Sequence, residues 1–271
     1  MSMMSAIGSV IRSTVVSVKS ALAELIGTAL FVTVATGTAV GLSSLATDSS
    51  GGYDAGVHAI GTAMAFGLTI TSLAYATAHT SGGQFNPAVT VGLVASGTIP
   101  ALQGALNIGS QVIGAVAGST IVYLMYPGGG ELERSSLGAN ILPPGMSAGK
   151  AFLGEMVATF ALVFVVLETA CSSKSKENRM MAPVAIGYMV FVEHMLFVCS
   201  PHGGNGVLCV SLTLTRDCKD YDMHLFNMLQ QSFQTLVSMM DIGFFVFSLL
   251  ALVLFFCWIS FLLAWCKLGW S

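Results

Sequence analysis

The segment His79–Thr90, with the sequence HTSGGQFNPAVT, combines residue types that can bind small polar molecules. The adjacent glycines Gly82 and Gly83 allow backbone conformations that other residues avoid. Asn86 is a favourable helix cap and Pro87 suits the first helical position, so a helix is expected to begin at Asn86. The segment therefore predicts an extended turn that leads directly into a helix.

The predicted helix is short. Gly97 and Pro100 stop it near Ser96, which leaves about 11 residues at roughly 1.5 Å each, on the order of 16 Å or half a bilayer. A half-helix that ends inside a membrane places its positive dipole end and its unpaired N–H groups near the bilayer midplane. The sequence therefore predicts a re-entrant half-helix.

This arrangement has a chemical use, because non-helical backbone inside a membrane is tolerated only where it meets protein or water. The Asn86 amide can donate to a passing oxygen, carbonyl groups of residues 81–85 can accept, and the helix end repels cations and protons. Small neutral hydrogen-bonding molecules suit such a lining. The alternative is that Asn86 caps an ordinary loop helix, but 76 uncharged residues between Asp54 and Glu131 disfavour it.

The composition excludes several classes of protein. Only 8% of the 271 residues are charged and 54% are hydrophobic, whereas a soluble domain carries roughly 25% charged residues. With 10 basic and 13 acidic residues, the chain has no basic stripe for nucleic acid. No nucleophile, base and orienting group are grouped as in an enzyme, and no cofactor or metal is expected. The six cysteines are interpreted as small buried apolar residues.

The intervals between charged residues predict six membrane spans, since a spanning helix needs about 20 apolar residues. The first lies between Glu24 and Asp48, and the second and third flank the half-helix within residues 55–130. The remaining three are expected at 151–171, 181–198 and 242–266. The fold class is therefore an all-α polytopic membrane protein.

The basic residues favour a cytoplasmic N-terminal tail, residues 1–18, because basic loops are retained on that side. The loop 172–180 is the clearest signal. This orientation places six basic residues inside, Arg12, Lys19, Lys174, Lys176, Arg179 and Lys267, and four outside, Arg134, Lys150, Arg216 and Lys219.

An internal repeat relates the two halves of the chain. Residues 23–28, AELIGT, open the first span, and residues 154–159, GEMVAT, open the fourth. In both copies a threonine follows the glutamate, Glu24 or Glu155, by four positions, which is about one helical turn. Because each half holds three spans, the second copy enters the membrane reversed, as in the inverted repeats of transport proteins. The functional site is expected between the halves.

Several stretches resemble one known family, namely AELIGTALFV, AFGLTI, HTSGGQFNPAVT, QVIGA, GEMVATFALVF and APVAIGYMVF. Residues 19–198 are similar to the aquaporin, or major intrinsic protein, family, with a first repeat at 19–126 and the start of a second at 150–198. The resemblance implies a bundle of six tilted helices and two half-helices in the lipid bilayer, usually a homotetramer with one pore per subunit. It also implies passage of water or a small neutral solute through a plasma or internal membrane.

The resemblance also implies roles for particular residues. The pore signature would be Asn86, Pro87 and Ala88, and the residues that support the re-entrant loops would be Glu24, Glu155, His79, Ser81 and Gly82. A buried membrane carboxylate needs N–H donors, which agrees with the role implied for the two glutamates.

Two further residues, Phe66 and His194, would form the selectivity filter, and their bulk favours water over glycerol. Without the resemblance, Phe66 would be interpreted as a core or lipid-facing residue. His194 would be interpreted as a satisfied buried histidine, or as the partner of its neighbour Glu193.

The resemblance ends near Met195. Residues 199–271 diverge, lack a second Asn-Pro-Ala, and contain no arginine before Arg216. Two functions therefore remain in view: a passive water channel, or a channel-inactive aquaporin-like protein or regulatory subunit that lacks the second half of the pore.

Overall fold

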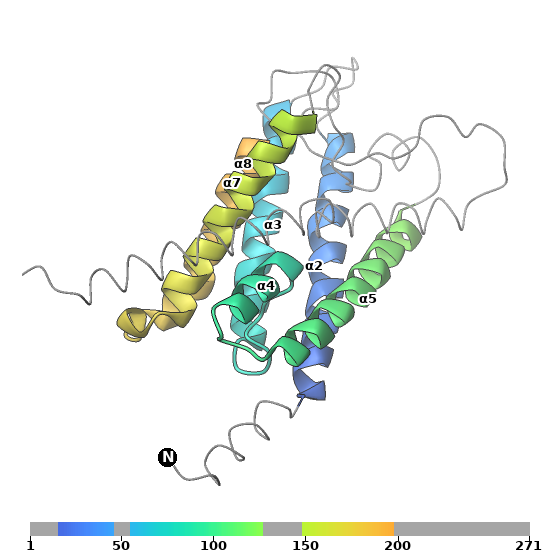
Figure 1. Ribbon diagram of the computed structural model, residues 1–271. Coiled ribbons are helices and arrows are strands. Elements are labelled where there is room, and N and C mark those ends of the chain that lie inside the picture. Colours follow the sequence, from blue (N-terminus) through green and yellow to red (C-terminus); the bar gives the residue numbers. More distant parts are fainter. Residues whose placement is uncertain (1–15, 46–54, 127–147, 198–271) are drawn as a thin grey trace, which may run out of the picture.

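The computed structural model describes residues 16–45, 55–126 and 148–197, and all of its regular elements are helical (Figure 1). The α-helices are α2 (Val18–Leu45), α3 (Ala55–Thr77), α4 (Pro87–Ala95), α5 (Ala101–Met125), α7 (Ala148–Val166) and α8 (Ala182–Phe197). A π-helical turn, Leu167–Cys171, extends α7, and two 3₁₀ turns, Ser173–Ser175 and Arg179–Met181, connect it to α8.

Four helices are long and apolar enough to cross a membrane, and they cover Val18–Leu42, Gly56–Thr77, Ala101–Met125 and Leu153–Cys171. They confirm four of the six predicted spans. The fifth predicted span coincides with α8, which has 16 described residues. The sixth, at 242–266, lies outside the described residues.

Close contacts between backbones hold the long helices together. A Cβ atom on Gly118 of α5 would lie 2.6 Å from the Ala29 carbonyl oxygen of α2. A Cβ atom on Gly67 of α3 would lie 2.6 Å from the Gly187 carbonyl oxygen of α8. Small residues at such crossings let membrane helices approach closely, where packing rather than hydrophobic burial stabilises their association.

The short helix α4 lies among the long helices, whereas α2 and α7 run in opposite directions (Figure 1). The start of α2 and the turn after α7 therefore lie at the same end of the bundle. This opposition matches the reversed second copy of the internal repeat.

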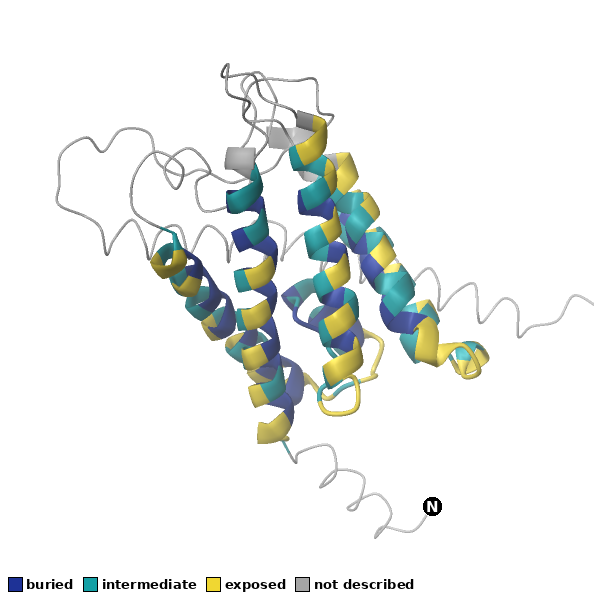
Figure 2. Ribbon diagram, turned by 180° about the vertical axis from the view of Figure 1, so that it is seen from behind, coloured by how far each residue is buried: buried dark blue, intermediate teal, exposed yellow. Residues whose placement is uncertain are grey.

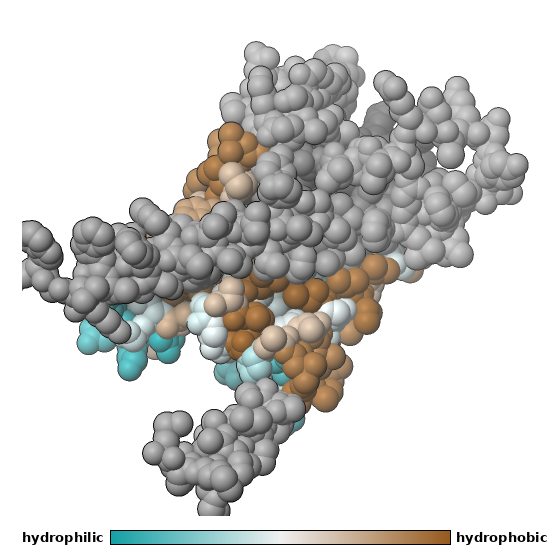
Figure 3. Space-filling model, viewed as in Figure 1, coloured by the Kyte–Doolittle hydropathy of each residue, from teal (hydrophilic) through white to brown (hydrophobic). Residues whose placement is uncertain are grey.

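The buried residues face the centre of the bundle and the exposed ones face outward (Figure 2). On α2, an exposed apolar stripe repeats every four residues, as expected for one helix face. It consists of Leu22, Ile26, Leu30 and Val34. Hydrophobic surface covers much of the visible part of the helices, and hydrophilic atoms gather at the turn after α7 (Figure 3). Such outward apolar surface is suited to lipid.

Candidate pore site

The half-helix begins where the sequence predicts. The Asn86 side-chain oxygen accepts hydrogen bonds from the backbone N–H groups of Ala88, at 2.8 Å, and Val89, at 3.4 Å. Pro87 occupies the first helical position, and Gly97, with a φ of 72°, follows the end of the helix. The Asn86 side-chain nitrogen has no hydrogen-bond partner among the described residues, so this donor is free for a ligand.

The turn before the half-helix is unusual at Phe85. Gly82 and Gly83 have positive φ values, which glycine adopts readily, but Phe85 also has a φ of 48°. This left-handed conformation is costly for a bulky side chain. The ring is 1% exposed and fills a gap that Gly27 leaves on α2, because a Cβ atom on Gly27 would overlap it. Burial of the ring offsets the backbone strain.

The Glu24 side chain binds the backbone of the same turn. This carboxylate is fully buried and accepts hydrogen bonds from the backbone N–H groups of Gln84, at 3.0 Å, and Phe85, at 2.7 Å. The Gln111 side chain of α5 donates a third bond at 2.7 Å. A buried charge is tolerated only with such partners. The chain is thus fixed immediately before Asn86.

A second set of bonds fixes the turn by its side chains. The Gln84 amide donates to the Ser81 carbonyl oxygen at 2.9 Å and accepts from the Thr90 hydroxyl at 2.7 Å. The Gln111 amide also reaches the Thr90 hydroxyl, at 2.9 Å. The Ser81 hydroxyl accepts from the Gly83 N–H at 3.1 Å. Sequence analysis did not identify Gln84 and Thr90, although both lie within the segment that it singled out.

The two expected filter residues lie against each other. The Phe66 and His194 rings stack with centroids 4.1 Å apart and planes at 29°. The Phe31 ring of α2 packs edge-on against the Phe66 ring, with the ring centroids 5.5 Å apart. The His194 Nδ1 lies 2.8 Å from the Val190 carbonyl oxygen, a distance at which the ring nitrogen donates. The rings are thus in direct contact and leave no passage between them.

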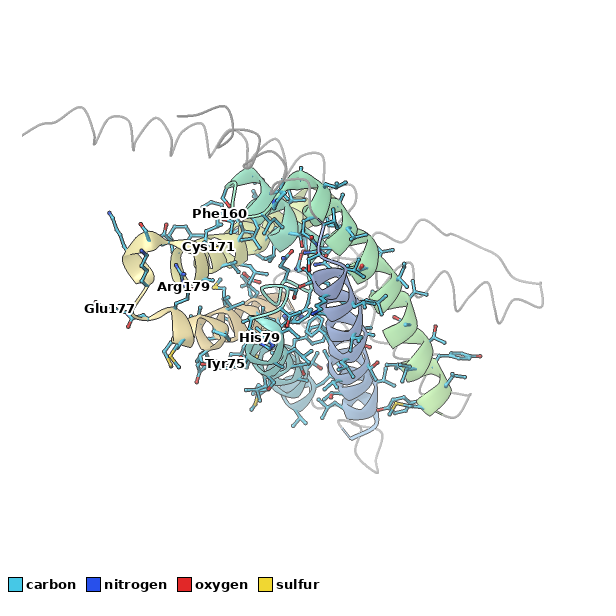
Figure 4. All side chains as sticks on the ribbon, turned by 90° about the horizontal axis from the view of Figure 1, so that it is seen from below. Tyr75, His79, Phe160, Cys171, Glu177 and Arg179 are labelled. Atoms are coloured by element: carbon cyan, nitrogen blue, oxygen red, sulfur yellow. The ribbon has the colours of Figure 1, made fainter. Side chains whose placement is uncertain are left out.

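The remaining candidate residues take different positions. His79 is exposed beyond the end of α3 (Figure 4), where it makes no hydrogen bond or ion pair within the described part of the chain. Glu155 is half-buried on α7, and the second re-entrant loop that it would support lies outside the described residues. The alternative pairing of Glu193 with His194 is not seen among the described residues, where His194 contacts the Val190 carbonyl oxygen and the Phe66 ring.

The fit between Gly27 and Phe85 predicts a stability change. Gly27→Ala places a methyl group inside the Phe85 ring, and such overpacking costs typically about 1–3 kcal/mol. We expect a lower thermal unfolding midpoint in detergent than for the parent protein. Gly109→Ala is the matched control, because nothing lies within 4 Å of its Cβ position. Equal midpoints for the two variants would mean that the ring is not held against α2.

Comparison with known proteins identifies relatives of the chain. A model of the family described as Major intrinsic protein matches residues 11–207. The chain is 38% identical over 192 residues to the probable aquaporin PIP2-8 of Oryza sativa subsp. japonica, a match covering 70% of this chain and 65% of that protein. It is 34% identical over 202 residues to aquaporin PIP2-4 of Zea mays, covering 70% and 66%. The match thus spans slightly less than two thirds of either relative.

A solved structure has a similar fold. The aquaglyceroporin from Plasmodium falciparum superposes with a TM-score of 0.56 at 19% identity, and the match covers 66% of this chain and 72% of that one. This likeness concerns the arrangement of the helices. Together with the family match over residues 11–207, it leads to one assignment: the chain belongs to the major intrinsic protein family.

Proposed function

We propose that the chain is a membrane channel for passive transport of water, with other small neutral solutes as secondary permeants. The observation that carries the proposal is the free Asn86 side-chain nitrogen at the N-terminal end of a half-helix inside the bundle. Water can accept a hydrogen bond from this amide as it passes. The relatives named as aquaporins support the same function.

The proposed mechanism is single-file permeation. Asn86 orients the oxygen of each water molecule, with Pro87 and Ala88 completing the pore signature. The positive end of α4 repels cations and protons, because the partial charge of a helix N-terminus is positive. Phe66 and His194, whose rings stack with centroids 4.1 Å apart, limit the size of the permeant.

Asn86→Asp tests the role of the free donor. The aspartate retains an oxygen that can cap α4 but loses the side-chain N–H groups and adds a negative charge. We expect the osmotic water permeability of reconstituted vesicles, measured by stopped-flow light scattering, to fall to that of protein-free vesicles. Permeability equal to that of the parent protein would exclude Asn86 from the pathway.

A second candidate function is that of a channel-inactive or regulatory subunit, which the missing second Asn-Pro-Ala in residues 199–271 favours. In that case, folded parent protein in vesicles would conduct no more water than the lipid alone. The activation energy separates the two functions further, because water in a channel bypasses the barrier of the lipid. A low activation energy together with raised permeability would support the channel.

We also propose a cytoplasmic N-terminus and a homotetramer. Lys19 lies at the end of the bundle where the turn after α7 carries Lys174, Lys176 and Arg179 (Figures 1 and 4). Basic residues concentrated at one end favour the cytoplasmic side. The exposed apolar stripe of α2 would face lipid or a second copy. Protease protection in sealed vesicles tests the orientation, and the mass of the detergent-solubilised protein tests the assembly.

A further inference from the structure

A row of amide side chains is buried on α5, a helix apolar enough to cross a membrane. Gln103, Asn107 and Gln111 are spaced by four residues, which places them on one face. Their exposed fractions are 8%, 0% and 1%. Buried amides need hydrogen-bond partners, since an unpaired one costs free energy. Gln111 contacts Glu24 and Thr90, as described above. The other two connect the start of α2 to the turn before Asn86.

Gln103 binds the first residues of α2. Its side-chain oxygen accepts from the Ser17 backbone N–H at 2.6 Å, and its side-chain nitrogen donates to the Asn107 side-chain oxygen at 2.7 Å. Ser17 caps α2, because its hydroxyl accepts from the Ser20 N–H at 3.2 Å. Gln103 therefore joins the cap of α2 to Asn107 in the second turn of α5.

Asn107 continues the chain of bonds toward the pore. Its side-chain oxygen also accepts from the Ser20 hydroxyl at 3.3 Å, and its side-chain nitrogen donates to the Gln84 side-chain oxygen at 3.4 Å. That oxygen is shared with the Thr90 hydroxyl, which lies 3.1 Å from the Asn86 carbonyl oxygen. A continuous path of polar contacts thus runs from Ser17 to Asn86.

We propose that Gln103 and Asn107 are positioning residues of the pore. They connect the N-terminal end of α2 to Gln84 and so fix the position of Asn86. Glu24 fixes the backbone of Gln84, whereas Asn107 fixes its side chain. Asn107 thus adds an attachment from α5 to the Gln84 side chain, beside its bonds to Ser81 and Thr90. This role would affect permeation only if the proposed channel function holds, but the positioning itself can be measured separately.

Asn107→Leu tests the proposal, because leucine has a similar branched shape without polar atoms. We expect amide hydrogen exchange of residues 84–92 in the full-length protein to accelerate at least about tenfold, while residues 153–166 of α7 exchange as before. Ser119→Ala is the matched control. Ser119 is buried on the same helix, and its hydroxyl has no partner among the described residues. This control is expected to leave the exchange of residues 84–92 unchanged.

Gln103→Leu is the second variant, and it decides the question if Asn107→Leu does not fold. It breaks the path one step further from the pore, so a smaller acceleration in the same segment is expected. Unchanged exchange at residues 84–92, or an equal rise throughout the helices, would overturn the proposal. Water permeability is measured on the same proteins. If the parent protein conducts no water, the channel function fails, while the exchange data still decide whether these residues position Asn86.

Discussion

Vesicles that contain the Glu24→Gln variant are expected to shrink after an osmotic jump at the rate of protein-free vesicles. The Glu24 carboxylate accepts from three N–H donors, those of Gln84, Phe85 and Gln111. A glutamine offers one oxygen and turns an NH₂ group toward the remaining donors. Each buried unsatisfied group costs about 1–3 kcal/mol. The turn would leave its place beside α2, and Asn86 would move with it.

The matched control is Glu168→Gln, the same substitution at an exposed position of the π-helical turn. It should conduct water as the parent protein does. Stopped-flow light scattering gives the permeability, and thermal unfolding in detergent shows whether each variant is folded. A folded Glu24→Gln variant with the parent permeability would refute the role of the carboxylate in holding the pore turn.

Phe66→Ala is expected to have the second large effect, a gain of glycerol permeability. The Phe66 ring lies against His194 and Phe31, so its removal opens space on the side of α3 that faces both. We expect glycerol-driven swelling of vesicles to accelerate by about tenfold or more, since a barrier lowered by about 1.4 kcal/mol changes a rate tenfold. Water permeability should not decrease.

Phe164→Ala is the control for this variant. Phe164 is 47% exposed on α7 and stacks with Phe160. Its substitution by alanine therefore removes a ring of equal size from the outer surface. Its solute selection should match that of the parent protein. If Phe66→Ala also excludes glycerol, the stacked rings do not limit solute size.

The sequence predicted the half-helix and the spans within the described residues well, because their signals are local. Asn86 and Pro87 define the start of α4 by their own chemistry, and Gly97 defines its end. Uncharged stretches likewise define the spans, since a charged residue in lipid is costly. Local signals of this kind can be interpreted without knowledge of tertiary contacts.

The side-chain network around the turn was not predicted, because its bonds join residues far apart in the sequence. Asn107 donates a hydrogen bond to Gln84, which is 23 positions away in the sequence, and Gln111 donates one to Glu24, 87 positions away. One signal was nevertheless readable, namely the four-residue spacing of the amides on α5. The left-handed Phe85 gave no such signal, because its conformation depends on the space beside Gly27.

The contact between the Phe66 and His194 rings could not be derived from residue types either. Sequence analysis placed Phe66 and His194 at one constriction but fixed no separation between them. Their separation depends on the crossing of α3 and α8, which Gly67 and Gly187 bring into backbone contact. The separation of the two rings is therefore a property of helix packing.

The crossing of α3 and α8 at Gly67 and Gly187 also constrains biogenesis, because the two glycines are separated by most of the described chain. The turn around Asn86 makes its hydrogen bonds to α2 and α5, which leave the ribosome before α7 and α8. The half-helix can therefore reach its position while α3 still lacks its later partner α8, which then brings His194 against Phe66. Synthesis from the N-terminus thus builds the turn around Asn86 first and the contact between the Phe66 and His194 rings last.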